Sequence, residues 1–560
     1  MEAEETAAQD QAPTERDSVK LDWFPNTSSF VLRVPRGEAD VSALVREHGL
    51  DISDPRSTAA EAVLFTKEPY CAASFGKYAS ASAMEQLAPM LREIEASRKV
   101  SSGAHIRVPM DKELWPFQKA DIEYALRRRN TLVGDEPGLG KTPIAIAFAN
   151  EINAKRVLVI CPASIRLQWV KRIREWTTMP WPYYIHPILH SRHGVHPTAQ
   201  WTIVSYELAR QDAIGRSLAK GLYDLLILDE AHYLKSVEAR RTRAVFSGQD
   251  GVSEPLAARA GAILALTGTP LPNRPREAYT LARGLCFDAI DWMSEDSFTN
   301  RFNPSQKVER YDEAKKRTIV YVDERSGRHA ELQNRLRANF MTRHLKREVM
   351  PQLKLPVYDL IQLDETAAIK QALAAEALLD IDPETLEGKD ISVMGDISTV
   401  RRMMGIAMAP QVADYVSMLI DGGESKLVLF AWHIEVMDIL ENKLRKHGLV
   451  RFKSGATKHN DIAKAEFIGN PRVQIILGNV MTLGTGTDGL QDVSSHVLIA
   501  EPDWTPGNNQ QMVDRLDRGG QKQTVQADIF VAPNSLAEKV LAVALRKLST
   551  TNRALDRRTE

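Results

Sequence analysis

Short apolar segments alternate with longer helical ones along most of this chain, and this alternation restricts the fold more than any other feature. In the first half, five apolar segments are separated by stretches with helical periodicity: residues 131–133, 157–160, 201–205, 225–228 and 263–267. The pattern returns in the second half at residues 426–430, 473–477, 497–500 and 527–531. Strands that alternate with helices form parallel sheets covered by helices on both faces. The sequence therefore predicts an α/β protein with two parallel-sheet lobes.

The segments around these two blocks define the rest of the domain plan. The stretch between the blocks is charged and mostly helical in pattern, with a hairpin expected at residues 317–322. The first residues are acidic and polar, as in disordered tails. The expected order is a disordered tail (1–18), a small α+β accessory domain (19–105), the first lobe (106–283), a helical insertion and brace (284–420), the second lobe (421–548) and a tail (549–560).

Composition and charge restrict the cellular setting. The 72 Lys and Arg residues balance 73 Asp and Glu residues, so a polyanionic partner would require basic residues concentrated on one face. Cys71, Cys161 and Cys286 are too far apart for a disulfide framework or a zinc motif, which favours a reducing compartment. The acidic start lacks the pattern of a secretory signal, and no apolar run approaches the ~18 residues of a membrane span. We expect a cytoplasmic or nucleoid-associated protein of a prokaryotic or virus-infected cell.

A glycine-rich turn follows the predicted strand at residues 131–133 and reads Gly-Asp-Glu-Pro-Gly-Leu-Gly-Lys-Thr over residues 134–142. Gly138 and Gly140 allow backbone conformations that let N–H groups surround a triphosphate. Lys141 would place a cation on the β- and γ-phosphates, and the Thr142 hydroxyl could hold Mg²⁺. Pro143 is tolerated only in a first helical turn, so a helix N-terminus should begin here. The turn predicts binding of ATP with Mg²⁺.

Two carboxylates end the apolar segment at residues 225–228. Asp229 would hold the metal, and Glu230 would orient and deprotonate the attacking water. His232 would link this pair to the rest of the protein. A buried strand that ends in Asp-Glu, downstream of a phosphate-binding turn, indicates nucleotide hydrolysis.

Several segments together resemble the core of superfamily-two helicases, in the Swi/Snf-like branch. Asp135 stands where the strict phosphate-loop pattern has its first glycine, as in the variant used by that superfamily. Ala500, Glu501 and Gly507 are most similar to the annealing-helicase, or fork-remodelling, group. The similarity covers residues 112–545 and is carried by residues 135–142, 229–232, 266–270, 340–346, 349–353, 503–506 and 510–521. It implies two RecA-like lobes and an ATP hydrolase, acting on acid anhydrides, that translocates on double-stranded DNA.

The resemblance also assigns roles to individual residues. Arg515 and Arg518 would reach from the second lobe to the γ-phosphate, where a planar guanidinium suits the spread charge of the transition state. They would be catalytic together with Lys141, Asp229 and Glu230. Gln118 would read the adenine, and coupling between the lobes would involve His232, Thr267 and Thr269. The remaining expected cofactor-binding residues are Asp135, Glu136, Gly138, Leu139, Gly140 and Thr142, with Thr142 and Asp229 holding the metal.

The expected DNA-contacting residues are Ser164, Gln168, Ser205, Ser454, Thr482 and Trp504. Ser164 fits equally well as a helix N-cap. Basic clusters could neutralise phosphates, although solvated helix faces have the same appearance. These are Arg325, Arg328, Arg335, Arg337, Arg343, Lys346 and Arg347 in the insertion, and Arg166, Lys171, Arg172 and Arg174 in the first lobe. One motif departs from the family: residues 484–490 carry an extra residue, which leaves the role of Asp488 open.

The leading hypothesis is an ATP-driven motor that moves on double-stranded DNA and remodels forks, junctions or recombination and repair intermediates. Residues 19–105 are the candidate for recognising DNA structure, and the sequence specifies no protein partner. The alternatives are a strand-separating DNA or RNA helicase, a motor that displaces proteins from DNA, and a binding module with an inactive ATPase. Intact Lys141, Glu230 and Arg518 argue against the inactive form.

Overall fold

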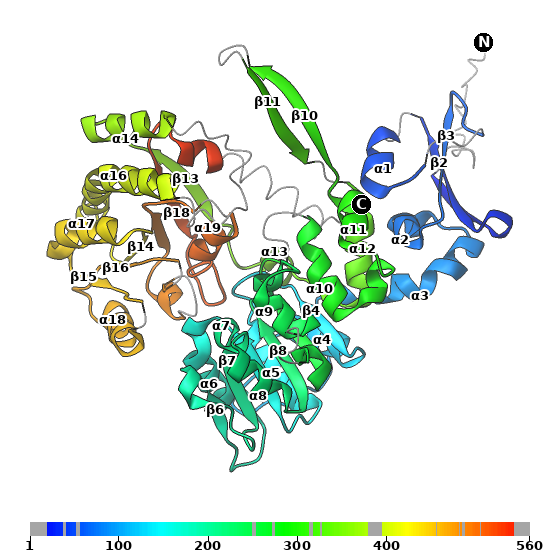
Figure 1. Cartoon of the computed structure of the whole chain (residues 1–560), viewed down its shortest axis with the longest axis horizontal. Helices are drawn as coiled ribbons and strands as arrows, with labels where there is room; N and C mark the ends of the chain where they lie inside the picture. The colour runs from blue at the N-terminus through cyan, green and yellow to red at the C-terminus, as the bar shows by residue number, and fades with distance from the viewer. Residues whose placement is uncertain are drawn as a thin grey trace, which may run out of the picture.

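The computed structural model describes twelve stretches of the chain. Two large parallel sheets, with a smaller antiparallel domain at the N-terminus, organise them (Figure 1). The described residues are 19–36, 41–51, 56–248, 254–270, 275–312, 317–324, 327–378, 395–454, 456–480, 482–483, 488–503 and 506–541.

The first lobe is built on a seven-stranded sheet with the order β12-β4-β9-β8-β5-β7-β6, in which all paired strands are parallel. Alternate residues of β5 belong to two separate cores, with Leu158 and Ile160 in one and Val157 and Val159 in the other. Helices cover both faces, so these strands are apolar throughout. The strands are β4 (Asn130–Val133), β5 (Val157–Cys161), β6 (Ile185–Pro187), β7 (Trp201–Ser205), β8 (Tyr223–Asp229), β9 (Ala260–Leu266) and β12 (Met341–Thr342). The helices include α4 (Pro116–Leu126), α5 (Lys141–Glu151), α6 (Arg166–Trp176), α7 (Tyr206–Ala209), α8 (Asp212–Ala219) and α10 (Ala278–Leu285).

The second lobe repeats this design with six parallel strands in the order β13-β18-β17-β14-β16-β15. Its two cores lie on opposite faces of the sheet, as shown by Leu427 and Leu429 in one and Val428 and Phe430 in the other. The strands are β13 (Val357–Gln362), β14 (Leu427–Phe430), β15 (Leu449–Arg451), β16 (Ile475–Gly478), β17 (His496–Ile499) and β18 (Gln526–Val531). The helices are α14 (Ala367–Ala377), α16 (Gly395–Asp421), α17 (Ile434–Leu444), α18 (Thr457–Gly469) and α19 (Pro506–Val513). The predicted fold class, with two parallel-sheet lobes, is confirmed.

The stretch between the lobes differs from the helical insertion that the sequence predicts over residues 284–420. It does contain α11 (Glu295–Phe302), α12 (His329–Asn339) and α13 (Lys346–Val349). A hairpin is present, but β10 (Ser305–Asp312) pairs with β11 (Arg317–Glu324), so the residues expected to form the whole hairpin, 317–322, form only its second strand. However, β12 pairs with β4 in the first lobe, and β13 pairs with β18 in the second. Both escaped prediction because β12 has two residues and β13 is a mostly exposed edge strand without a continuous apolar run.

The accessory domain has the expected α+β composition. Its antiparallel sheet has the order β1-β2-β3, formed by β1 (Lys20–Phe24), β2 (Ser29–Pro35) and β3 (Glu61–Thr66), with helices α1 (Val41–His48), α2 (Pro69–Ala72) and α3 (Ala81–Ser97). In the view of Figure 1 it lies on the side of the first lobe away from the second lobe. It packs on α12, where Asn334 Nδ2 donates to the Tyr70 carbonyl at 2.8 Å. The accessory domain is thus joined to the first lobe through the inserted helix.

One stretch of α16, Ile397–Asp421, is long and apolar enough to cross a membrane by length and composition alone. The apolar runs of the sequence predicted no such span. Met408, Val412 and Val416 of this helix lie in the core of the second lobe, and core helices commonly meet the same criterion. The helix is therefore weak evidence for a membrane segment.

Candidate active site

A cavity of about 360 Å³ lies between the two lobes. One wall comes from the phosphate loop, α6 and the end of β8 in the first lobe, and the other from residues on both sides of β17 in the second. The functional side chains that line it are Lys141, Thr142, Gln168, Trp169, Arg172, Asp229, Glu230, Asp488, Gln491, Gln511, Arg515 and Arg518. The structure thus brings together residues that the sequence places almost 400 positions apart.

The phosphate loop has the geometry that its sequence predicts. Gly138 and Gly140 have φ angles of +89° and +77°, a left-handed conformation that favours glycine. Gly140 is the N-cap of α5, and Pro143 falls in the first turn of that helix. The N–H groups at the start of α5 therefore border the cavity, where a helix N-terminus suits phosphate.

Lys141 lies across its own loop. Its Nζ donates to the carbonyl oxygens of Asp135 and Glu136, at 2.7 and 3.2 Å. Burial lowers the pKa of Lys141, while the charges of Glu230, Asp135 and Asp229 oppose this shift. The ammonium is positioned beside the carboxylate pair, where it can move from loop carbonyls to phosphate oxygens.

A segment from the end of the inserted stretch supports the loop from outside. The amides of Leu132, Gly134 and Glu136 donate to the carbonyl oxygens of Phe340, Thr342 and His344, at 2.7, 2.8 and 3.1 Å. These bonds continue the pairing of β4 with β12 past the end of the strand. The phosphate loop is therefore held by residues about 200 positions downstream.

The two carboxylates at the end of β8 have different surroundings. Asp229 Oδ2 accepts from the indole Nε1 of Trp169 at 2.7 Å, and Oδ1 accepts from the Glu230 amide at 3.0 Å. Burial, followed by the charge of Glu230, raises the pKa of Asp229 to about 7. Burial also acts on Glu230, but its hydrogen bond to His232 and the charges of His232 and Lys141 outweigh it and lower its pKa. Glu230 is thus the ionised partner of the pair.

The predicted coupling residues meet at one histidine nitrogen. His232 Nδ1 lies 3.2 Å from Glu230 Oε2, 3.0 Å from Thr267 Oγ1 and 3.5 Å from Thr269 Oγ1. Thr267 is fully buried and its hydroxyl also accepts from the Thr269 amide at 3.1 Å. The end of β8 and the loop after β9 are therefore joined directly at the carboxylate pair.

The two arginines of the second lobe face the phosphate loop. A Cβ on Gly138 would lie 2.8 Å from the Cβ of Arg518, which shows how closely the lobes approach. Arg518 Nη1 donates to Asp488 Oδ1 at 2.7 Å. Burial, and then the charge of Arg518, lower the pKa of Arg515 to about 10, so Arg515 stays charged at neutral pH.

Three predicted nucleotide-binding residues do not face the cavity. Gln118 accepts from the Trp115 amide at 2.9 Å and donates to the Leu139 carbonyl at 3.0 Å, so both ends of its amide brace the loop. Leu139 packs into a small apolar cluster. Asp135 is fully buried against His344, with 3.1 Å between Oδ1 and Nδ1. These residues shape the loop from behind.

Glu136 also turns away from the cavity. Its carboxylate accepts from the Lys346 amide at 2.6 Å, and burial raises its pKa. Its part in the site is its backbone carbonyl, which Lys141 contacts.

The predicted DNA contacts are distributed over several environments. Ser205 is 2% exposed and caps α7, where its hydroxyl accepts from the Leu208 amide at 3.2 Å, so it is not available to a phosphate. Gln168 donates to Asp488 inside the cavity, at 3.2 Å. Ser164 is exposed, and the N-cap of α6 is Ile165, which removes the capping interpretation. Ser454 is exposed and Thr482 bonds to Asn479, while Trp504 lies outside the described residues.

The expectation that the basic cluster of the insertion neutralises DNA phosphates is wrong for its central members. Arg335 is fully buried and bonds to Glu331 at 2.8 Å. Lys346 Nζ lies between Asp514 and Asp517, at 2.5 and 2.7 Å. Arg337 and Arg343 are also buried and donate to backbone carbonyls. Helical spacing alone did not distinguish these internal cations from a solvated basic face.

Several functional positions were not recognised from the sequence. The Trp169 indole fixes Asp229, and Asp488 connects the two lobes. His344 and Lys346 contact the phosphate loop from the segment after β12. A tryptophan one residue after a predicted DNA contact was the available signal for Trp169. Asp488, His344 and Lys346 each have partners more than 150 residues away, which local motifs do not reveal.

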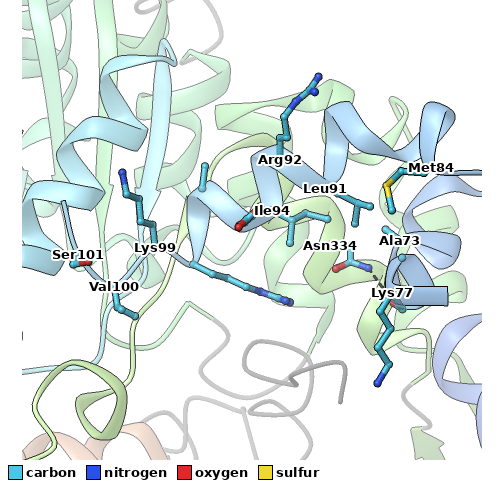
Figure 2. A pocket seen from close by; sticks show the side chains of 15 residues that line it. Ala73, Lys77, Met84, Leu91, Arg92, Ile94, Lys99, Val100, Ser101 and Asn334 are labelled. Atoms are coloured by element: carbon cyan, nitrogen blue, oxygen red, sulfur yellow. Dashed lines mark hydrogen bonds between the residues drawn. The ribbon is translucent and has the colours of Figure 1, made fainter. Parts of the chain in front are cut away.

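A larger cavity of about 930 Å³ lies along α3 in the accessory domain (Figure 2). Met84 and Leu91 provide apolar walls, and Lys77, Arg92 and Lys99 contribute cationic side chains. We call this cavity the accessory groove. It contains none of the residues predicted for nucleotide binding.

A glycine loop with its lysine and a carboxylate pair on one lobe, opposed by two arginines on the other, define a two-lobed nucleoside-triphosphate-binding protein. The chain belongs to the SNF2 family within that class, because the family described as "SNF2-related domain" matches residues 62–382.

Two groups of curated relatives match four fifths of the chain. The "DNA annealing helicase and endonuclease ZRANB3" of Bos taurus is 28% identical over 465 residues, which are 80% of this chain and 41% of the relative. The "SWI/SNF-related matrix-associated actin-dependent regulator of chromatin subfamily A-like protein 1" of Xenopus tropicalis is 26% identical over 80% of this chain and 45% of the relative. The chain thus spans less than half the length of these relatives. The predicted resemblance to the annealing-helicase group is confirmed.

Among solved structures, the "Sulfolobus solfataricus SWI2/SNF2 ATPase core in complex with dsDNA" matches 82% of this chain and 99% of that chain. The sequence identity is 17% and the TM-score is 0.38.

Proposed function

We propose that the chain is an ATP-driven motor that translocates on double-stranded DNA and remodels forks or junctions. The observation that carries this proposal is the single cavity with Lys141 and Glu230 on one lobe and Arg515 and Arg518 on the other. Only a closed arrangement lets one triphosphate meet all four side chains, so nucleotide binding and release would drive lobe movement.

The residues around the cavity fit ATP with Mg²⁺. The N–H groups of the glycine loop and Lys141 would hold the phosphates, and Thr142 and Asp229 would hold Mg²⁺. Mg²⁺ would supply charge stabilisation on the phosphoryl oxygens. Glu230, ionised through His232, would orient the attacking water and receive its proton. Arg515 and Arg518 would stabilise the charge that develops on the transferred phosphoryl group.

DNA as the track is supported by family membership and by the names of the relatives. Both groups of relatives align with 80% of this chain, and their names describe proteins that act on DNA or in chromatin. Charge does not identify the track, because the buried cations of the insertion are neutralised internally.

The accessory groove supports a role for residues 19–105 in recognising DNA structure. It combines Lys77, Arg92, Arg98 and Lys99 with one acidic residue, Glu95, so its lining carries a net positive charge. Basic linings attract the phosphate backbone without regard to sequence.

ATP hydrolysis measured with duplex, forked, single-stranded DNA and RNA tests the function. We expect strong stimulation by duplex and a further increase with forked DNA. Stimulation by RNA alone, or by none of these nucleic acids, would contradict the proposal. Stimulation restricted to single-stranded DNA would favour a strand-separating helicase.

A further inference from the structure

Asp488 bonds to three side chains that line the cavity, and the sequence motif around it assigns it no role. It lies just before the short helix η12 (Leu490–Asp492) of the second lobe. Its Oδ1 accepts from Arg518 at 2.7 Å, and its Oδ2 accepts from Gln168 at 3.2 Å and from Arg172. One carboxylate therefore bonds to an arginine of its own lobe and to two side chains of α6 in the first lobe.

The position of this carboxylate conflicts with a bound triphosphate. Asp488 lines the same cavity as Lys141 and Thr142, so a triphosphate there adds several negative charges next to it. Arg518 already touches the phosphate loop, since a Cβ on Gly138 would lie 2.8 Å from its Cβ. A small movement of the guanidinium would exchange one anionic partner for another.

We propose that Asp488 is a latch that competes with the γ-phosphate for Arg518. Without nucleotide, the carboxylate holds Arg518 and ties the lobes together through Arg172 and Gln168. A triphosphate takes Arg518 away from it. A diphosphate has no γ-phosphate and leaves Arg518 on Asp488. Before nucleotide binds, the latch thus lowers the affinity of the cavity for a triphosphate relative to a diphosphate. This inference rests on the proposed ATP-binding role of the cavity.

The charge of Asp488 supports this exchange. Burial opposes its charge, but Arg518 and then Arg172 outweigh burial and lower the pKa of Asp488, so the latch is ionised near neutral pH. A charge-assisted hydrogen bond is stronger than a neutral one, and the carboxylate and the phosphate offer Arg518 the same kind of bond.

Nucleotide binding to Asp488→Asn, measured by calorimetry without DNA, tests the competition. The probes are a non-hydrolysable ATP analogue and ADP, each with Mg²⁺. Loss of the competing charge should tighten binding of the triphosphate analogue by about tenfold and change ADP binding by no more than about twofold. An equal change for both nucleotides, or no tightening for the analogue, would overturn the proposal.

Asp492→Asn is the matched control. Asp492 is an exposed carboxylate in η12, four residues further on, and it accepts from Gln491 at 3.3 Å. This variant should bind both nucleotides like the wild type. If it tightens triphosphate binding as much as Asp488→Asn does, the effect is one of general charge and the latch is refuted.

Arg172→Gln separates the tie between the lobes from the competition for Arg518. This variant keeps the pair of Asp488 and Arg518, so triphosphate binding should not tighten. Spin labels at Leu222 and Met418, which are exposed in the first and second lobes, report the distance between the lobes. Without nucleotide, both Asp488→Asn and Arg172→Gln should broaden the distance distribution. An unchanged distribution in both variants would refute the tie.

These outcomes distinguish the latch from the proposed function. If the wild-type chain binds neither nucleotide, the proposed function fails. If it binds both and Asp488→Asn leaves their affinity ratio unchanged, only the latch fails.

Discussion

At the scale of single residues, the chemistry of the site depends on two neighbouring carboxylates whose pKa values are moved in opposite directions. Asp229 is fixed by an indole and an amide, and its pKa rises to about 7. Glu230 has φ of +52°, a left-handed conformation that is rare outside glycine and aims its side chain at His232. Backbone strain at this position is consistent with a catalytic base.

Glu230→Gln should separate binding from turnover. The amide keeps the size of the side chain but cannot receive a proton, so we expect hydrolysis to fall by at least about 100-fold with ATP affinity largely retained. Lys141→Ala should abolish hydrolysis and also weaken ATP binding, because it removes the cation that would contact the phosphates. Steady-state hydrolysis and nucleotide binding provide the two measurements.

The control is Glu207→Gln, an exposed glutamate at the start of α7, which should leave both quantities unchanged. Near-normal turnover in Glu230→Gln would exclude Glu230 as the base.

A second carboxylate with a raised pKa lies behind the phosphate loop. Asp121 is fully buried, and His344 Nδ1 lies 3.3 Å from it and 3.1 Å from Asp135. Burial, and then the charge of Asp135, raise the pKa of Asp121 from 3.8 to about 7. The two carboxylates also raise the pKa of His344, which favours an imidazolium between them.

This cluster predicts a pH dependence of stability. A raised carboxyl pKa in the folded state gives stability that is complete below the unfolded pKa and is lost as the pH rises through about 7. Between pH 6 and 8 we expect the free energy of unfolding of the wild type to fall by about 1 kcal/mol more than that of Asp121→Asn. Thermal unfolding midpoints at the two pH values measure this difference; equal slopes for both proteins would contradict it.

At the scale of elements, α12 is the connection between the accessory domain and the first lobe. Glu331 and Arg335 are both fully buried and bond to each other at 2.8 Å. Arg335 also reaches Glu68 of the accessory domain and Asp291, which follows Ile290 of the first lobe's core. A buried ion pair contributes little by itself, but removal of one partner leaves an uncompensated charge.

Arg335→Ala should therefore destabilise this junction by about 3 kcal/mol, because the buried charge of Glu331 keeps only Arg301 and Arg328 as partners. Thermal unfolding with limited proteolysis should show earlier unfolding and release of the accessory domain. Arg347→Ala, which removes an exposed cation from α13, is the control and should change the midpoint little. A midpoint for Arg335→Ala close to that of the control would contradict the assigned role of α12.

A comparison of predicted and observed strands shows which parts of the fold leave a local signal in the sequence. Strands with continuous apolar runs, such as β5 and β8, were predicted within a residue or two because burial on both faces leaves a local signal. The short strands β6, β12 and β15 leave no such signal, since their places are set by distant partners. For the same reason Lys141 and Glu230 could be assigned from local motifs, whereas Gln118 and Asp488 acquire their partners only in the folded chain.

At the scale of the whole molecule, the cavity proposed to bind nucleotide lies between the lobes. The accessory domain lies on the far side of the first lobe in the view of Figure 1. Closure of the lobes would change the spacing of their proposed DNA contacts, while the accessory domain would move with the first lobe through α12. The surface proposed to recognise DNA structure and half of the proposed motor would thus move as one body.

Lys77→Glu combined with Arg92→Glu tests that surface. Both side chains are exposed and border the accessory groove (Figure 2). We expect weaker binding to forked DNA, on the order of 1 kcal/mol per reversed charge, with unchanged maximal ATP hydrolysis on linear duplex. Competition binding between forked and linear DNA measures the preference.

Lys67→Glu is the matched control, because Lys67 is an exposed residue of the accessory domain that lies outside the groove. An equal loss of fork binding in the control, or no loss in the double variant, would argue against the groove.

The pairing of β4 with β12 has a consequence for synthesis of the protein. The strand that enters the phosphate loop lacks its neighbour until residues 340–344 have left the ribosome. A nascent chain, or a fragment that stops at residue 283, would carry every residue of the first lobe that is proposed to contact nucleotide, but with an unpaired strand edge. Such edges promote misassociation during folding. Expression of the first lobe alone should therefore require residues through at least 346.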